Sequence, residues 1–315
     1  MLEATLLSRL GEDICLKFQP TNHKYVYLCD CGAASDLTIK DCHDLGALFV
    51  SHTHIDHFCN FDGIFRHQLA VGRGIVVCGP PGIARNVSNK LNGYIWNLMY
   101  DDKAVYYEVR EIESPGVVAV YHLRVPTWEP VLQERIETDV VYANDAFSAK
   151  YAMLDHGTPS IAYRFEEPSK LKIGKFEQRP GPWIAALKDA FLAKDSERVL
   201  DIHGEQVEAG ELFELLFEEK GDSVGYAMDH AATEENHALI EELMNEVGHL
   251  FIECYYHDED KELAEANRHS TSTASGQAAR RARAKKATPC HFSRRYNDSI
   301  DEVRAAFEDA FRGEE

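Results

Sequence analysis

The sequence of 315 residues contains no long apolar run, no Cys-x-x-Cys pair and no internal repeat. Its first residues include an early acid, Glu3, and no apolar stretch of the length that a signal peptide or a membrane span needs, so we expect no membrane association. The eight cysteines are scattered along the chain. This usage predicts reduced thiols in a cytoplasmic protein instead of a disulfide framework.

Basic charge is also scarce, since 33 Lys and Arg residues stand against 53 Asp and Glu residues and give a net charge of −20. Such a surface repels nucleic acid on average. Any polyanionic substrate must therefore be held by local positive charge. Apolar residues make up 44% of the chain, which is enough to bury a large core.

The most informative feature that is present is the cluster Ser-His-Thr-His-Ile-Asp-His at residues 51–57. It directly follows an apolar run, a pattern typical of a buried strand that ends in a loop. Neutral imidazoles and a carboxylate suit Zn²⁺ or a similar cation. At this spacing the side chains cannot all reach one ion, so we predict two adjacent metals, with His52 and His54 at one and Asp56 and His57 at the other. A solvated histidine-rich loop is the alternative.

Strand-like runs in the first half give way to alternating strands and helices, which predicts α/β layers. Among the helices, we expect one over residues 205–220 and one that begins after an N-cap at Thr233. A capping box from Ser299 to Glu302 is expected to open the last helix. The Cys-Asp-Cys segment at residues 29–31 is either a metal pair or, as its strand-like setting favours, a pair of structural thiols.

Further metal-capable residues occur where a predicted strand meets a loop, namely His156, Asp229 and His291. Layered folds present their chemistry from such positions. Each of these residues taken alone could be an ordinary loop residue. Together they can provide the ligands that two metals need beyond those of a single loop.

These motifs resemble those of the metallo-β-lactamase superfamily, whose signature is the His-x-His-x-Asp-His loop. A His-Ser-Thr triplet at residues 269–271 and the ending His-Phe-Ser-x-Arg-Tyr at residues 291–296 are similar to the ribonuclease Z branch. The resemblance implies a four-layer αββα sandwich of class α/β in a single domain over residues 1–315. It also implies a short projecting arm for substrate at about residues 166–205, where Pro180-Gly181-Pro182 is similar to the arm of that branch.

Carried over position by position, the resemblance implies seven ligands for two divalent ions: His52, His54 and His156 for one, Asp56, His57 and His291 for the other, and Asp229 as a bridge. Zn is the simplest choice of metal, with Mn or Fe possible. A histidine at the third position of the loop is typical of hydrolytic members, whereas oxygen-reducing di-iron relatives have Glu there. The resemblance therefore argues against redox chemistry.

The function that the resemblance implies is endonucleolytic hydrolysis of RNA, such as tRNA 3′ processing, by a hydroxide that bridges two metals. Asp56 would hold the attacking water, and His269 would protonate the leaving ribose oxygen or clamp the phosphate. A surface imidazole is the alternative for His269. A homodimer is expected because ribonucleases Z commonly act as dimers. Five arginines are predicted to contact RNA, with a solvated helix face as the alternative: Arg280, Arg281, Arg283, Arg294 and Arg295.

The chain departs from the ribonuclease Z pattern at several positions next to these motifs. The opening Gly-Thr-Gly turn is absent, and the usual Gly-Asp-Thr has become Met228-Asp229-His230. The usual His-Glu-Ala-Thr strand end reads Ile252-Glu253-Cys254-Tyr255, and Arg268 replaces the usual Gly before the triplet. These differences concern the substrate more than the hydrolysis. A phosphodiesterase or ester hydrolase for small molecules and a non-catalytic RNA-binding module are therefore the alternative functions.

Overall fold

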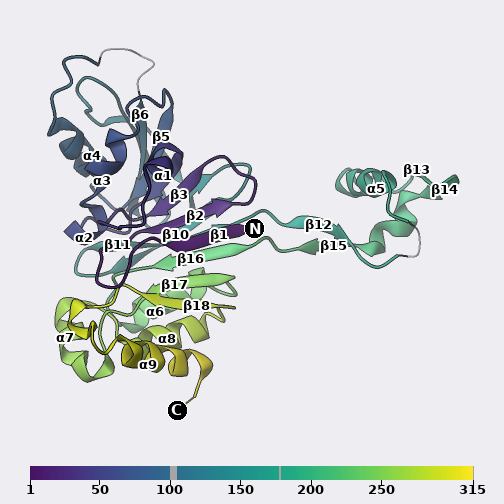
Figure 1. The fold of residues 1–315 in the computed structure, drawn as a ribbon. Coiled ribbons are helices and arrows are strands. Elements are labelled where there is room, and N and C mark those ends of the chain that lie inside the picture. The colour runs from purple at the N-terminus through teal and green to yellow at the C-terminus, as the bar shows by residue number, and fades with distance from the viewer. Residues whose placement is uncertain (100–104, 177–178, 315) are drawn as a thin grey trace. The chain divides into compact units, whose positions relative to one another are not determined.

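The computed structural model describes residues 1–99, 105–176 and 179–314. The chain divides into two compact units, one formed by Met1–Glu166 with Asp222–Glu315 and the other by Glu167–Gly221. Two sheets lie face to face in the larger unit, with helices on both outer sides (Figure 1). This is the α/β layering that the sequence predicts and the four-layer sandwich that the family resemblance implies. Within the described ranges, no helix is both long and apolar enough to cross a membrane.

The first sheet has eight strands whose spatial order follows the sequence, and its central pairs from β3 to β6 are parallel. Its outer pairs are antiparallel. The strands are β1 (Leu2–Leu6), β2 (Leu16–Pro20), β3 (Val26–Cys29), β4 (Leu45–Phe49), β5 (Gly74–Gly79), β6 (Tyr106–Ser114), β7 (Val117–Leu123) and β8 (Val131–Glu137).

The second sheet has six strands in the order β18-β17-β16-β11-β10-β9, so the three strands of residues 223–290 lie beside the three strands of residues 140–166. β16, β17 and β18 pair in parallel, while β9, β10, β11 and β16 pair antiparallel. The strands are β9 (Val140–Ala143), β10 (Ser148–Asp155), β11 (Pro159–Glu166), β16 (Ser223–Ala227), β17 (His249–Glu253) and β18 (Ala287–Cys290).

Helices pack their apolar faces on the outer side of each sheet, which produces a separate apolar cluster on each side. The first sheet is accompanied by α1 (Ile39–His43), α2 (Ile55–Phe58), α3 (Phe61–Arg66) and α4 (Ile83–Asn92). The second is accompanied by α6 (Glu234–Leu243), η2 (Asp258–Asp260), α7 (Lys261–Asn267), α8 (Ser272–Arg281), η3 (Arg294–Tyr296) and α9 (Ile300–Arg312), where η marks a 3-10 helix.

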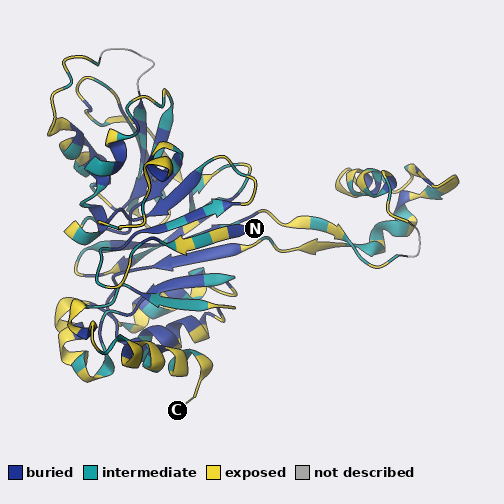
Figure 2. Ribbon diagram, viewed as in Figure 1, coloured by how far each residue is buried: buried dark blue, intermediate teal, exposed yellow. Residues whose placement is uncertain are grey.

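Aromatic side chains contribute much of the core between the two sheets, where the strands are largely buried (Figure 2). The ring centroids of Phe18 and Phe165 are 4.2 Å apart, and those of Phe49 and Phe165 are 4.8 Å apart. Full burial of one such side chain stabilises the fold by about 1.5–3 kcal/mol. The sheets are thus held together as a rigid pair, and the loops at their strand ends are free to carry chemistry.

The structure confirms some of the expected local features and contradicts another. Thr233 is the N-cap of α6, and its hydroxyl accepts a hydrogen bond from the backbone N–H of Asn236. The capping box at Ser299 is wrong, because the Ser299 side chain caps nothing within the described residues. The Ser299 N–H instead donates to the carbonyl of Tyr296 at 2.9 Å, so the chain enters α9 from a 3-10 turn and not from an extended segment.

The cysteines of the 29–31 segment are structural, as their setting favours. Cys29 and Cys31 are fully buried in the apolar clusters on either side of the first sheet. Burial, together with the negative charges nearby, raises the pKa of both thiols well above the ordinary value. They therefore remain protonated and are poor metal ligands.

The smaller unit has its own apolar core, built around Trp183, Leu187 and Leu200. A helix over 205–220 is wrong, because its first residues pair with the preceding strand and Gly210 lies close to the backbone of Ser196. The elements are β12 (Lys170–Ile173), α5 (Trp183–Leu192), β13 (Val199–Ile202), β14 (Glu205–Glu208), the 3-10 helix η1 (Ala209–Leu215) and β15 (Leu216–Glu219).

Candidate metal and catalytic site

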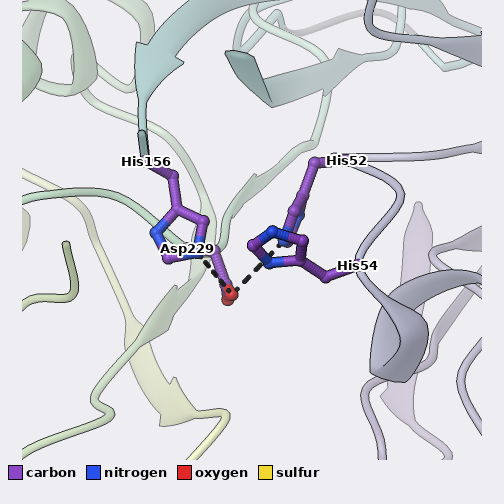
Figure 3. A group of neighbouring side chains, drawn as sticks. All are labelled: His52, His54, His156 and Asp229. Carbon is purple, nitrogen blue, oxygen red and sulfur yellow. Dashed lines mark ion pairs between the residues drawn. The ribbon is translucent and has the colours of Figure 1, made fainter. Parts of the chain in front are cut away.

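One group of potential metal ligands joins side chains from both halves of the larger unit. His52 and His54 lie between β4 and α2, His156 directly follows β10, and Asp229 follows β16. One donor atom from each of the four lies within 4.8 Å of the others (Figure 3). The Asp229 Oδ2 atom is 3.6 Å from His52 Nε2 and 3.5 Å from His156 Nε2. Residues more than 170 positions apart thus converge at one point.

A second group adjoins the first and consists of Asp56, His57 and His291, again with donor atoms within 4.8 Å of one another. His291 Nε2 is 3.3 Å from Asp56 Oδ2. Asp229 lies between the two groups, since its Oδ2 is 3.3 Å from His57 Nε2 and its Oδ1 is 2.9 Å from His291 Nδ1. The structure therefore brings all seven predicted ligands together, with Asp229 between the two groups.

The donor atoms of this cluster suit divalent cations. His52 Nε2, His57 Nε2, Asp229 Oδ1 and His291 Nδ1 are buried and lie close to other polar atoms of the cluster, but among the described residues none of them forms a hydrogen bond of good geometry. Buried polar atoms without a partner cost free energy, and a cation within the cluster would offset that cost. Imidazole and carboxylate donors in this number favour a borderline divalent metal.

The charges of the metal-free cluster follow from burial and proximity. Burial, with the neighbouring positive charge of His57, lowers the pKa of His52 to about 2, so this imidazole is neutral and ready to coordinate. Burial would lower the pKa of His291, but the Asp229 carboxylate outweighs it and raises that pKa to about 9. The pKa of Asp229 lies well below its ordinary value because His291 and His57 outweigh its burial. Metal binding would thus displace a proton from His291.

In three of the five cluster histidines, the nitrogen that is turned away from the cluster is held by a hydrogen bond. His57 Nδ1 is 2.8 Å from Asp30 Oδ2, and His156 Nδ1 is 2.6 Å from the carbonyl oxygen of Arg268. The Ser51 hydroxyl is 3.1 Å from His52 Nδ1. Such contacts fix the ring orientation and tautomer of a metal-binding histidine. In each case Nε2 is left to face the cluster.

Asp30 is a functional residue that the sequence analysis missed. It is fully buried, and it accepts hydrogen bonds from the N–H and hydroxyl of Ser51, both at 2.7 Å, and from the hydroxyl of Tyr226 at 2.6 Å. Through these bonds and its contact with His57, the Asp30 carboxylate at the end of β3 links the loop of residues 51–57 to β16. An acid at the end of an apolar strand was the available signal, and the flanking cysteines obscured it.

Four residues around the cluster adopt left-handed backbone conformations at or after a strand or helix end: Asp30 at φ 55°, Asp229 at φ 39°, Arg268 at φ 60° and His291 at φ 56°. Such strain in non-glycine residues is concentrated at functional sites. It also explains the family's usual Gly at position 268. Here the Arg268 guanidinium donates a hydrogen bond to Asp155 at 2.8 Å.

His269 is buried beside the cluster, with only 9% of its surface exposed, and is therefore not a surface imidazole. Its Nδ1 lies 2.9 Å from Oε2 of Glu253, a fully buried carboxylate that also accepts the N–H of His230 at 2.6 Å. Burial lowers the pKa of His269, but Glu253 outweighs it and raises the pKa above the ordinary value. Its Nε2 is then the nitrogen available to a substrate. Glu253 was noted in the sequence only as part of an altered strand end.

The predicted RNA-contacting arginines occupy different environments. Arg294 lines a cavity that Asp56 and His291 also line. Three others are engaged with acidic side chains: Arg281 with Glu241, Arg283 with Glu246, and Arg295 with Asp260. Arg280 lies at the C-terminal end of α8. The cluster and Arg294 thus share a cavity, and RNA contact by the five arginines stays a prediction.

Comparison with known proteins agrees with this site. The chain is 32% identical over 294 residues to the ribonuclease Z of Deinococcus radiodurans, an alignment that covers 86% of this chain and 83% of that protein. It is 27% identical over 300 residues to the ribonuclease Z of Bacillus subtilis, covering 91% and 84% of the two chains. No family model matches the chain.

Two solved structures share the fold at low sequence identity. The metallo-β-lactamase fold protein YhfI of Bacillus subtilis has a TM-score of 0.59 at 14% identity, covering 99% of this chain and 94% of that one. The short form of human tRNase Z has a TM-score of 0.57 at 15% identity, covering 94% of both chains. Taken with the Deinococcus relative, these likenesses show that the chain belongs to the ribonuclease Z family and is a metal-dependent phosphodiesterase of the metallo-β-lactamase fold.

Proposed function

We propose that this protein is an endoribonuclease that cleaves tRNA precursors at their 3′ side and leaves a 3′-hydroxyl. The convergence of seven predicted ligands into two adjoining groups, with Asp229 between them, carries this proposal. The relatives that share most of the chain's length bear the name ribonuclease Z. A small-molecule hydrolase of the same fold is the alternative, and the comparisons do not favour it.

We assign one divalent ion to His52, His54 and His156 and a second to Asp56, His57 and His291. Asp229 would bind both. Zn²⁺ fits this donor set most simply, while Mn²⁺ and Fe²⁺ are the other candidates. Bound there, the ions would activate a water molecule and neutralise charge on the phosphate.

Two side chains are proposed to act on the substrate directly. Asp56 is half-buried at the edge of the cavity, where its carboxylate can accept a hydrogen bond from the attacking water. Because Glu253 raises the pKa of His269, this imidazole is prepared to donate a proton to the departing ribose oxygen. Removing that proton from His269 leaves a neutral ring still hydrogen-bonded to Glu253.

The substrate would reach the cluster through the cavity that Arg294 lines, and Arg294 would contact a phosphate there. The unit of residues 167–221 is proposed to be the substrate arm, with the exposed side chains of Lys170, Lys172 and Lys175 as phosphate contacts. We further propose that the protein acts as a homodimer in the cytoplasm.

The test is cleavage of a precursor tRNA by the purified protein with Zn²⁺ or Mn²⁺, combined with metal analysis. We expect about two metal ions per chain, a product with a 3′-hydroxyl, and loss of both in His52→Ala. Hydrolysis of bis-p-nitrophenyl phosphate serves as a substrate without RNA. Hydrolysis of that diester without a cut in the precursor would overturn the RNA assignment and favour a small-molecule substrate.

A further inference from the structure

A cavity of about 520 Å³ opens beside the metal cluster, and one of its walls is the side chain of Tyr255. Its volume falls within the range of small-ligand sites, about 300–1,000 Å³. Asp56 and His291 line the same cavity. Any group bound there would therefore lie next to a phosphate held at the cluster.

Tyr255 stands between this cavity and His269. It comes two residues after the end of β17, and its ring is stacked on the His269 imidazole with centroids 3.9 Å apart and planes 6° apart. The His291 ring is 5.1 Å away. Tyr255 is only half-buried, so part of its ring remains open to the cavity. This is one of the positions at which the chain departs from the ribonuclease Z pattern, which has Thr there.

Two further apolar side chains complete the wall. Ile55, which lies in the segment of residues 51–57, is 80% exposed, and Phe292 directly follows His291. Together with the Tyr255 ring, these side chains give the cavity an apolar wall. Flat, uncharged rings are the chemical class that such a wall accommodates.

The charges of the cavity exclude a second phosphate from its interior. Glu12, Asp13 and Asp56 all line it, and like charges would repel an anion. Among the lysines and arginines, the described lining holds Arg294, whose guanidinium donates to the carbonyl of Gly11 at 2.9 Å and to Asp13 at 3.1 Å. Arg294 is largely exposed, so it lies at the cavity rim and suits a phosphate outside.

We infer that this cavity is a nucleobase subsite in which the base next to the scissile phosphate stacks on Tyr255, with Ile55 and Phe292 beside it. This inference rests on the proposed function and specifies the part of the substrate that the site recognises. Stacking of a base on an aromatic side chain strengthens binding by about tenfold to a hundredfold. The same ring holds the His269 imidazole on its other side, which makes Tyr255 a positioning residue as well.

The experiment compares two ligands that differ only in the base, AMP and ribose 5-phosphate, by calorimetry on the protein loaded with Mn²⁺. In the wild-type protein AMP should bind at least about tenfold more tightly. Tyr255→Thr should bring the two affinities close together, whereas Tyr255→Phe should preserve the difference. Tyr255→Leu retains apolar packing without an aromatic ring and should also lose the difference.

The matched control is Tyr94→Thr, which removes a tyrosine that is exposed outside this cavity and should keep the preference for AMP. Equal affinities for AMP and ribose 5-phosphate in the wild type, or an unchanged preference in Tyr255→Thr and Tyr255→Leu, would overturn the inference. Calorimetry requires no RNA cleavage. A base preference without cleavage of precursor tRNA would leave the subsite standing and overturn only the proposed substrate.

Discussion

The larger unit buries the side chains proposed to carry its chemistry, whereas the unit of residues 167–221 keeps its described charged side chains, Glu167 apart, at least partly exposed to solvent. In the larger unit, Asp30, His57 and Asp229 are almost fully buried and are held by one another. In the smaller unit, Lys170 and Lys175 are exposed. The donor atoms of a metal site have to be buried and held in position by their neighbours. A phosphate-binding surface has to stay exposed, so a small core is enough to support it.

The two units also differ in how their charge is arranged. The smaller unit has twelve acidic and eight basic residues, so it is acidic as a whole, although its segment 170–179 is basic. Any RNA contact in that unit should therefore be limited to this segment. In the larger unit, positive charge near the cluster comes from single residues such as Arg294.

The largest effect is expected from the metal ligands of the larger unit. His52→Ala should lower hydrolysis of both bis-p-nitrophenyl phosphate and RNA by about a thousandfold or more, because the metals provide several kcal/mol of transition-state stabilisation and each 1.36 kcal/mol is a factor of ten. Activity assays with metal analysis would measure it. Full activity with the normal metal content would contradict the assigned site.

A smaller effect is expected from the residue that only supports a ligand. Asp30→Asn should weaken metal binding by about tenfold to a hundredfold, because the amide holds His57 less firmly than the carboxylate does. Metal affinity would be measured by competition with a chelator. The control is Asp41→Asn, another buried carboxylate, which binds Thr38 and Lys17 and should alter stability alone. Equal metal affinities in the two variants would contradict the role of Asp30.

Removal of the smaller unit would distinguish its contribution to RNA binding from the hydrolytic activity of the larger unit. Glu166 of β11 is paired with Ser223 of β16, so an Asn-Gly turn can replace residues 167–222 and close the hairpin. We expect cleavage of precursor tRNA to fall by about tenfold as phosphate contacts are lost, with hydrolysis of bis-p-nitrophenyl phosphate retained. An equal fall for both substrates would show that the unit supports the metal site itself.

The smallest effects should distinguish two arginines of the larger unit. Arg294→Ala should raise the KM for RNA about threefold to tenfold and reduce the salt dependence of binding by one phosphate contact. Arg281→Ala should change the KM little, because Arg281 is paired with Glu241 and an exposed ion pair contributes only about 0.2–1 kcal/mol to stability. Salt titrations of both variants would measure this difference. The opposite order would place the RNA along α8.

Comparison of prediction with structure shows which kinds of signal a sequence carries. The loop at 51–57 could be recognised from the sequence as a candidate metal site, because closely spaced histidines directly after a strand are typical of metal binding. Asp30 and Glu253 could not be recognised in this way. Each is a single acidic residue whose role becomes apparent only from its contact with a histidine, His57 for Asp30 and His269 for Glu253. The helix expected over 205–220 is wrong because its first residues form a local hairpin with β13, although the apolar spacing also suits a helix.

The sequence by itself determined the layered α/β class, the candidate ligands and the resemblance to ribonuclease Z, since these depend on local patterns and on motifs. Only the tertiary structure decided which nitrogen of His57 faces the cluster, that Asp229 lies between the two groups, and that Tyr255 stacks on His269. Those relations depend on how strand ends from two sheets meet in space. The distance along the chain does not encode them.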